Sequence, residues 1–193
     1  NAMPYVRTLL ILDAQGNVLV ANHEQLVGQN FRERDYFQMV ANGPNFDTLY
    51  LGPPFKTALG AFSMNLVRMV RGANGEFAGI VSATLDPEGI KNVMNSVRYA
   101  PDIWASLAHG DGKMFLMVPG RDVLLGTNLA KPGSLFSRHR DSGQPASVMT
   151  DTVMLTGEKR MLAQHTLQPP GLKMNKPLVI GIGRDVGAMY AKW

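Results

Sequence analysis

The sequence predicts an α+β fold of two similar units, each an antiparallel sheet flanked by helices. Two observations support this. Short segments rich in strand-forming residues are separated by turns that contain Gly or Asn, which is typical of β-hairpins. The order of hairpin, helix and further strands then occurs twice, as in an internal repeat. We expect the first unit to span residues 1–99 and the second to span residues 100–193.

The elements of the first unit follow from its apolar segments and turns. Residues 8–13 and 18–21 form a hairpin that is apolar on both faces, so we expect it in the centre of a sheet. Asn74-Gly75 between two apolar segments is the strongest short signal of a hairpin. Asp86 caps a helix that begins at Pro87 and has a core-facing stripe. The stripe is Ile90, Val93, Met94 and Val97, and the other expected elements are a helix at 34–41 and strands at 47–51, 61–71 and 77–85.

The second unit shows the same layout. A strand at 104–107 leads through the turn His109-Gly110-Asp111-Gly112 into a strand at 113–118. We expect a helical or irregular stretch at 134–140, followed by strands at 148–155, 160–167 and 178–183.

The composition indicates a folded protein and limits its partners. The 193 residues are 45% hydrophobic, which is enough for a core in each unit. The net charge of +4 is mild, and the one basic cluster, residues 138–140, is followed by Asp141, so we expect no nucleic-acid binding. Cys is absent, which excludes disulfides and thiolate metal sites, and the four His include no H-x₃-H pair. We therefore expect no metal.

No apolar segment approaches the ~20 residues that span a bilayer, and no signal peptide is visible. Asn1-Ala2 looks like the remnant of a cleaved expression tag. We expect an excised soluble fragment of a longer protein, connected to a membrane only through flanking helices that this sequence lacks.

No strong catalytic or cofactor motif occurs, so we expect neither an enzyme nor a cofactor. The Gly-rich segment 181–187 follows a strand but lacks the helix, second strand and acidic residue of a dinucleotide site. Ser137, His139 and Asp141 lie close in sequence, and a triad depends on geometry that the sequence does not show. A small hydrolase is therefore the weaker alternative.

The most informative segment is 27–37, where a polar loop enters a short helix through Arg34, Tyr36 and Phe37. Arg34 can bind a carboxylate through its two-pronged guanidinium group, and Tyr36 can form a wall of the same pocket. Alternatively, Arg34 makes a local salt bridge and the two aromatic residues belong to the core. The residue types leave both interpretations open.

The segment resembles the R-x-[YW]-[FY] signature of Cache (PDC) sensor domains. Residues 11–18 and 74–81 resemble two hairpins of that family, and Gly28-Gln29-Asn30 resembles the step before its signature. The chain is thus similar to a double Cache domain, most closely over residues 8–98. The resemblance implies two PAS-like units, with the ligand pocket in the first, membrane-distal unit and Trp193 near the exit towards the membrane.

The resemblance also implies ligand-binding residues. Arg34 and Tyr36 take positions that bind the ligand carboxylate in amino-acid-binding members, and Phe55 lies near a later Tyr position. Thr84 takes the position of the acidic residue that binds the ligand amine. We therefore expect a small carboxylate without an α-ammonium group. Tyr50 is expected to line the pocket as well.

One further strand contributes candidates. Ser63, Asn65 and Arg68 are expected to share one face of it. If that face points inward, Arg68 is a second cation for the ligand. If it points outward, all three side chains are solvated.

The implied function is small-molecule sensing in the periplasm, as part of an inner-membrane receptor of the histidine kinase, diguanylate cyclase or chemoreceptor kind. The resemblance allows a homodimer in the full-length receptor. The alternatives are a structural or dimerisation module that binds nothing, and the hydrolase.

Overall fold

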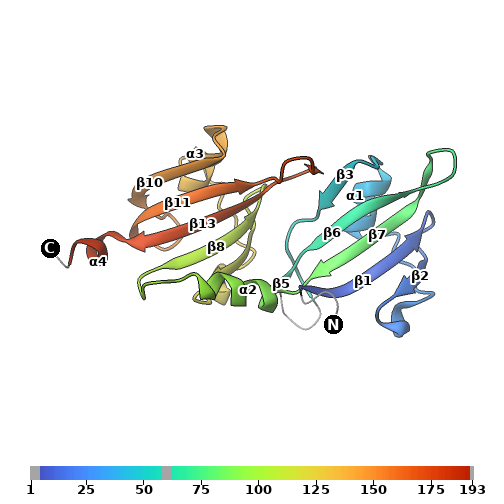
Figure 1. Cartoon of the computed structure of the whole chain (residues 1–193), viewed down its shortest axis with the longest axis horizontal. Coiled ribbons are helices and arrows are strands. Elements are labelled where there is room, and N and C mark those ends of the chain that lie inside the picture. The colour runs from blue at the N-terminus through green and yellow to red at the C-terminus, as the bar shows by residue number, and fades with distance from the viewer. Residues whose placement is uncertain (1–4, 58–61, 192–193) are drawn as a thin grey trace. The chain divides into compact units, whose positions relative to one another are not determined.

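The computed structural model describes residues 5–57 and 62–191, which form two compact units (Figure 1). The first unit comprises residues 1–53, 63–86 and 168–176, and the second comprises residues 54–62, 87–167 and 177–193. The chain therefore crosses between the units more than once. Residues 1–4, Ala61 and Trp193, which carried expectations above, lie outside the described residues.

The first unit is a six-stranded sheet in the order β12-β3-β6-β7-β1-β2. Neighbouring strands are antiparallel except β12 and β3, which are parallel. Asn175, next to β12, fixes this pairing, because its Oδ1 accepts a hydrogen bond of 2.7 Å from the Leu51 amide. The strands are β1 (Val6–Asp13), β2 (Val18–Ala21), β3 (Thr48–Leu51), β6 (Asn65–Arg71), β7 (Phe77–Leu85) and β12 (Lys173–Met174), and the helices are η1 (Glu24–Leu26) and α1 (Asp35–Ala41).

The core of the first unit lies between one face of this sheet and α1. Phe37 and Val40 of α1 pack against alternate residues of the strands, such as Leu10 and Leu12 of β1. At the edge of the sheet, Leu19 and Val20 of β2 are exposed. The expectation of a central hairpin is therefore right for β1, which lies between β7 and β2, and wrong for β2, which forms the edge.

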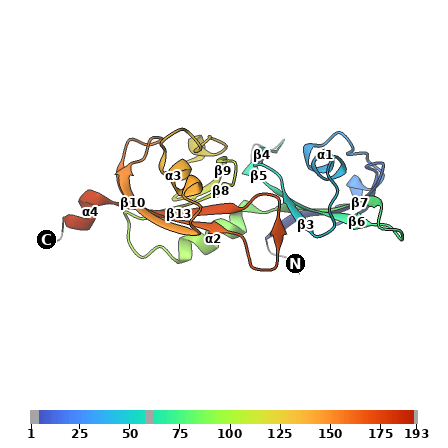
Figure 2. The same cartoon turned by 90° about the horizontal axis from the view of Figure 1, so that it is seen from above.

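The second unit is a five-stranded antiparallel sheet in the order β10-β11-β13-β8-β9. Figure 2 shows α3 over one face of this sheet and α2 over the other, and every residue of β8 and β9 is buried. The strands are β8 (Trp104–His109), β9 (Met114–Val118), β10 (Ala146–Thr152), β11 (Lys159–Leu167) and β13 (Leu178–Asp185), and the helices are α2 (Pro87–Ser96), η2 (Asp122–Leu124), α3 (Leu135–Asp141) and α4 (Val186–Tyr190).

Three local expectations need correction. The strand expected at 61–71 is divided into β5 (Phe62–Ser63), which pairs with β4 (Phe55–Lys56), and β6. The strand expected at 148–155 ends at Thr152, because the next residues form a turn. Met94 of α2 is buried, but Val93 of α2 and Val97, which follows the helix, are exposed, so only part of the expected stripe faces the core.

The internal repeat is confirmed at matched turns. Gly16 and Gly112 close the first hairpin of each unit with φ of 85° and 95°, a backbone conformation that favours glycine. A Cβ atom at Gly16 would lie 2.6 Å from the Arg32 amide nitrogen, and one at Gly112 would lie 2.6 Å from the Ala130 Cβ. The segments that follow these hairpins also correspond in the two units. The pairs are η1 and η2, Gly28 and Gly126, Asn30 and Asn128, which each form an isolated β-bridge, and α1 and α3.

Candidate functional site

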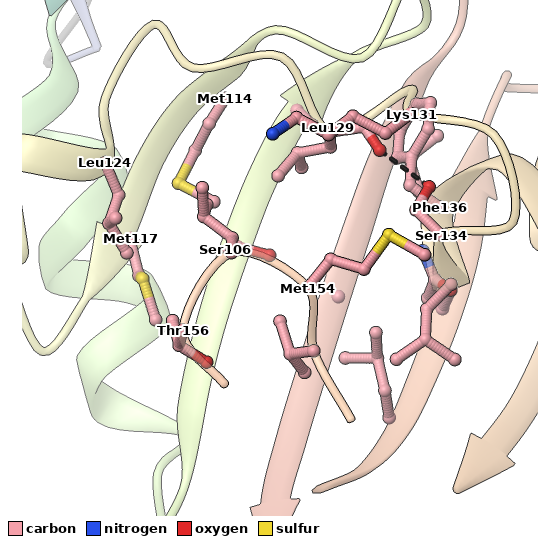
Figure 3. Close-up of a pocket in the computed structure, with 18 of the residues that line it drawn as sticks. Ser106, Met114, Met117, Leu124, Leu129, Lys131, Ser134, Phe136, Met154 and Thr156 are labelled. Carbon is pink, nitrogen blue, oxygen red and sulfur yellow. Dashed lines mark hydrogen bonds between the residues drawn. The ribbon is translucent and has the colours of Figure 1, made fainter. Parts of the chain in front are cut away.

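A cavity lies in the second unit, on the face of the sheet that α3 covers (Figure 3). Its volume is about 70 Å³. That corresponds to roughly five water molecules. Most lining residues are apolar, namely Trp104, Ala108, Met114, Met117, Leu124, Leu129, Leu135, Phe136, Val153, Met154, Leu155, Leu162, Val179 and Gly181, and the polar ones are Ser106, Asn128, Lys131, Ser134, Thr156 and Gln164.

The register of three strands explains why space is left here. Gly181 of β13 lies between Ser106 of β8 and Gln164 of β11, and the next row places Gly183 between Trp104 and Leu162. Directly paired residues point to the same face of a sheet. β13 therefore has no side chain in either row. The indole ring of Trp104 covers Gly183, where a Cβ atom would lie 2.6 Å from Trp104 Cε2, and the cavity lies over Gly181.

Helix and turn residues enclose the cavity. Figure 3 shows Met117, Leu124 and Thr156 on one side of it and Ser134 and Phe136 on the other. Ser134 caps α3: its hydroxyl donates to the Leu129 carbonyl at 2.7 Å and accepts from the Ser137 amide at 3.1 Å. The Ser134 side chain is therefore already bound to the backbone on both sides.

Two polar atoms of the lining are buried without a partner. Trp104 is 6% exposed and Gln164 is 5% exposed, and within the described part of the chain neither Trp104 Nε1 nor Gln164 Oε1 has a hydrogen-bond partner. An unsatisfied buried donor or acceptor costs about 1–3 kcal/mol. Such groups in a native structure call for an explanation, and a small molecule or water in the cavity would provide one.

The guanidinium group of Arg160 packs against the ring of Trp104. Its guanidinium carbon lies 5.9 Å from the centre of the Trp104 ring, Nη1 donates to the Asp102 carbonyl at 2.7 Å, and Nε donates to Glu158 at 2.9 Å. Glu158 also accepts from Arg121 at 2.9 Å. Burial raises the pKa of Glu158, but its bonds to the two arginines outweigh that and leave the pKa below its usual range.

The predicted site residues of the first unit are partly brought together. Arg34 is exposed at the start of α1, with its guanidinium carbon 5.6 Å from the centre of the Phe31 ring. Tyr36 packs against the first core, and this burial raises the pKa of its hydroxyl to about 12. Tyr50 is buried in the same core and donates its hydroxyl to the Gly43 carbonyl.

The remaining predicted residues occupy different environments. Asn65 and Thr84 lie opposite each other in β6 and β7, and the Thr84 hydroxyl donates to Asn65 Oδ1 at 2.8 Å. Arg68 is exposed and donates to the Phe46 carbonyl at 3.3 Å. Phe55 is exposed and groups with the second unit.

The expectation of one shared face is wrong for Arg68. Successive side chains of a strand alternate between its faces, so Asn65 lies with the core residue Val67 and Arg68 lies on the opposite side. Ser63 is buried and donates to the Leu85 carbonyl at 3.2 Å.

Comparisons with solved structures identify the architecture. The extracellular domain of rpHK1S-Z16, which is described as a histidine kinase, matches with a TM-score of 0.80 and 21% identity, over 100% of this chain and 76% of the other. The periplasmic sensory domain of the Campylobacter jejuni chemoreceptor Tlp1 matches with a TM-score of 0.69 and 14% identity, over 96% and 74%. The ligand-binding domain of the Pseudomonas aeruginosa chemoreceptor PctB, in complex with L-Arg, matches with 0.68 and 17%, over 96% and 74%.

The chain has the double Cache fold. The two PAS-like units expected from the sequence are thereby confirmed. No protein-family model matches the sequence, and no curated protein does.

Within this double Cache fold, the residues considered for a hydrolase bind separate partners. Ser137 donates to the Lys131 carbonyl at 2.9 Å, and Asp141 accepts from Arg140 at 2.8 Å. His139 is 1% exposed and its two ring nitrogens contact the hydroxyls of Ser147 and Thr166, at 2.8 and 3.0 Å. Burial, together with nearby His165, lowers the pKa of His139. His139 thus connects α3 to β10 and β11.

Among the described residues, no group of three or more His, Asp or Glu side chains is placed to hold a metal ion. In the same part of the chain, no helix combines the length and apolar character needed to cross a membrane.

Sequence reasoning missed the cavity of the second Cache unit. A signal was present, because Gly181 and Gly183 are two residues apart in one strand and so lie on one face. Glycine inside a strand often marks the close approach of another group. The same residues were considered above only as a dinucleotide motif, and the structure places both inside β13.

Proposed function

We propose that this chain is the extracytoplasmic small-molecule sensing domain of a bacterial transmembrane receptor. The observation that carries the proposal is the double Cache fold over the whole chain, at a TM-score of 0.80 to an extracellular domain described as part of a histidine kinase. The chemoreceptor domains with the same fold include one in complex with L-Arg. We assign this chain the same kind of task, binding rather than catalysis, in the periplasm.

In the first unit, a small carboxylate is the proposed ligand and Arg34 its main contact. The guanidinium group is exposed, and among the described residues no carboxylate pairs with it. The Tyr36 hydroxyl is protonated at neutral pH, at its ordinary pKa as at the value of about 12 that burial gives it, so it can donate a hydrogen bond to an anion. The charge of Arg34 acts on the Tyr36 hydroxyl and lowers its pKa against the larger effect of burial, which supports a common contact of the two groups with one carboxylate.

The same unit offers little to an α-ammonium group at the position that the resemblance indicated. Thr84 and Asn65 satisfy each other at 2.8 Å and carry no charge. A ligand ammonium there would lose its hydration without gaining a carboxylate partner. The proposal is therefore an organic acid, with Tyr50, Asn65 and Thr84 contributing to the shape of the site. Phe55, which groups with the second unit, and Arg68, which lies on the opposite face of β6, have no part in it.

Thermal unfolding in the presence of organic acids and amino acids tests the proposal. The protein is first refolded from denaturant, so that any bound molecule is removed. An acid at a hundred times its Kd should stabilise the fold by about 2.7 kcal/mol, which is a rise of several degrees in Tm. Propionate, lactate and succinate are compared with alanine and arginine.

Two matched variants locate the site. Arg34→Ala should abolish the shift, whereas Arg32→Ala, which removes another exposed arginine two residues earlier, should retain it. Tight binding of an amino acid without any response to the acids would contradict the ligand class. An unchanged shift in Arg34→Ala would contradict the site.

A further inference from the structure

The cavity of the second unit has the features of a separate ligand site. It is lined mainly by apolar side chains, which stabilise a ligand by removing its apolar surface from water. Its floor is formed by the gap over Gly181. A core that served only packing would fill this gap, because protein interiors are close-packed and voids are destabilising.

The unpaired polar atoms indicate what the occupant must offer. Trp104 Nε1 can only donate a hydrogen bond, and Gln164 Oε1 can only accept one. The two ends of an amide are assigned from their hydrogen bonds, so Gln164 can also turn its NH₂ group inward, and either end needs a polar partner. An occupant with both accepting and donating capacity, such as a hydroxyl or a primary amide, satisfies both residues.

The charges around the cavity argue against an ion. Lys131 is the one charged residue of the lining within the described part of the chain, and it is exposed. The two repeats also differ in charge at the residue that begins the helix. Arg34 is the N-cap of α1, and the N-cap of α3 is Ser134, whose hydroxyl is already bound to the backbone at 2.7 and 3.1 Å. The second unit therefore lacks the cation that the first unit has at this position.

We propose that the cavity of the second unit binds an uncharged, mainly apolar small molecule through hydrogen bonds to Trp104 Nε1 and the Gln164 amide. The volume of about 70 Å³ limits the occupant to a small molecule. This site is additional to the carboxylate site of the first unit, and the two differ in the charge of the ligand.

The sequence provides its own reporter for the test. The chain has two tryptophans, so Trp193→Phe leaves Trp104 as the single tryptophan, and its emission reports on the cavity. The probes are cyclohexanol, methylcyclohexane of the same size without a polar group, and cyclohexanecarboxylate. After refolding from denaturant, cyclohexanol should give a saturable change, about tenfold tighter than methylcyclohexane because only the alcohol makes hydrogen bonds. The carboxylate should bind most weakly.

Three variants in this background separate the possible roles. Gln164→Leu removes an unsatisfied amide at similar volume, so we expect Tm to rise and the preference for the alcohol to disappear. Ser106→Leu extends a side chain into the cavity and should abolish binding of all three probes. Arg34→Ala should leave cyclohexanol binding unchanged, which distinguishes this site from that of the organic acids.

Several outcomes would overturn the inference. If no probe binds and Gln164→Leu lowers Tm, the amide is a structural partner of the fold. If cyclohexanecarboxylate binds best, the site is anionic and Lys131 governs it. If Ser106→Leu leaves cyclohexanol binding intact, the molecule binds elsewhere. None of these outcomes affects the response to organic acids that depends on Arg34.

Discussion

A methyl group at Gly183 should disturb Trp104 directly. A Cβ atom built at Gly183 would lie 2.6 Å from Trp104 Cε2, 2.7 Å from Cζ2 and 3.1 Å from Nε1. Ordinary van der Waals contact begins near 3.4 Å, so the indole ring must move by about 1 Å in Gly183→Ala. Trp104 is 6% exposed and Arg160 stacks over it, so there is little room for the ring to move away from the cavity.

The expected loss of stability follows from two opposing effects. Forcing extra volume into a packed core costs about 1–3 kcal/mol. Replacing Gly by Ala reduces the entropy of the unfolded chain and returns about 0.4–1 kcal/mol. The net destabilisation of Gly183→Ala should therefore be about 0.5–2 kcal/mol, accompanied by a change in Trp104 emission.

Gly181→Ala is the matched control. It is the same substitution on the same strand and face, but the added Cβ would lie 3.0 Å from Ser106 Oγ and 3.5 Å from Leu162, which a small shift relieves. We expect a change within about 0.5 kcal/mol in Gly181→Ala. Urea unfolding followed by tryptophan emission measures both variants. Equal stability and equal emission of the two would refute the argument that Gly183 is required by the approach of Trp104.

Two further predictions concern buried polar groups. The pKa of His139 is lowered by burial, so the unfolded chain binds a proton more readily than the folded one. Its contribution to stability is therefore complete above the ordinary pKa of 6.5 and declines as pH falls below it. The free energy of unfolding measured in urea should drop between pH 7 and pH 5, by at most about 1.4 kcal/mol per pH unit for one proton. His139→Gln should flatten this slope, and an equal slope in both proteins would refute the assignment. Arg160→Met removes a guanidinium group bonded to Glu158 at 2.9 Å and should destabilise the second unit by about 2 kcal/mol. Arg121→Met, which affects a more exposed pair with Glu158, should cost less than about 1 kcal/mol, and equal costs would contradict the argument from burial.

The elements that the sequence predicted correctly are those with local causes. Gly75, with φ of 88°, closes the hairpin of β6 and β7 as the Asn-Gly pair indicated. The parallel pairing of β12 with β3 had no local signal, because Asn175 and Leu51 are 124 residues apart. Edge and central positions were also not predictable from β2 alone, since an apolar segment is compatible with either.

The site residues could likewise be predicted only where they lie in one short segment of the sequence. Arg34 and Tyr36 stand out because one short segment contains both, whereas the cavity depends on rows that join Ser106, Gly181 and Gln164 across three strands. Residues that meet only through strand register have no common signature in the sequence. The repeat would have helped, because Leu26-x-Gly28-x-Asn30 has its counterpart in Leu124-x-Gly126-x-Asn128. Aligning these segments shows that the second unit carries no arginine at the end of the loop.

One of the strands that line the cavity, β13, leads directly into α4. Gly181 forms part of the floor of the cavity, and the same strand continues through Gly183, Arg184 and Asp185 into α4. Arg184 donates to both oxygens of Asp102, at 2.9 and 3.0 Å, and Asp185 caps α4 by accepting from the Ala188 amide at 2.8 Å. A ligand changes an equilibrium only through its different affinity for two states. An occupant that favours one position of Trp104 over Gly183 would therefore act on the strand that leads into α4, whereas a carboxylate at Arg34 would act through α1 of the other unit.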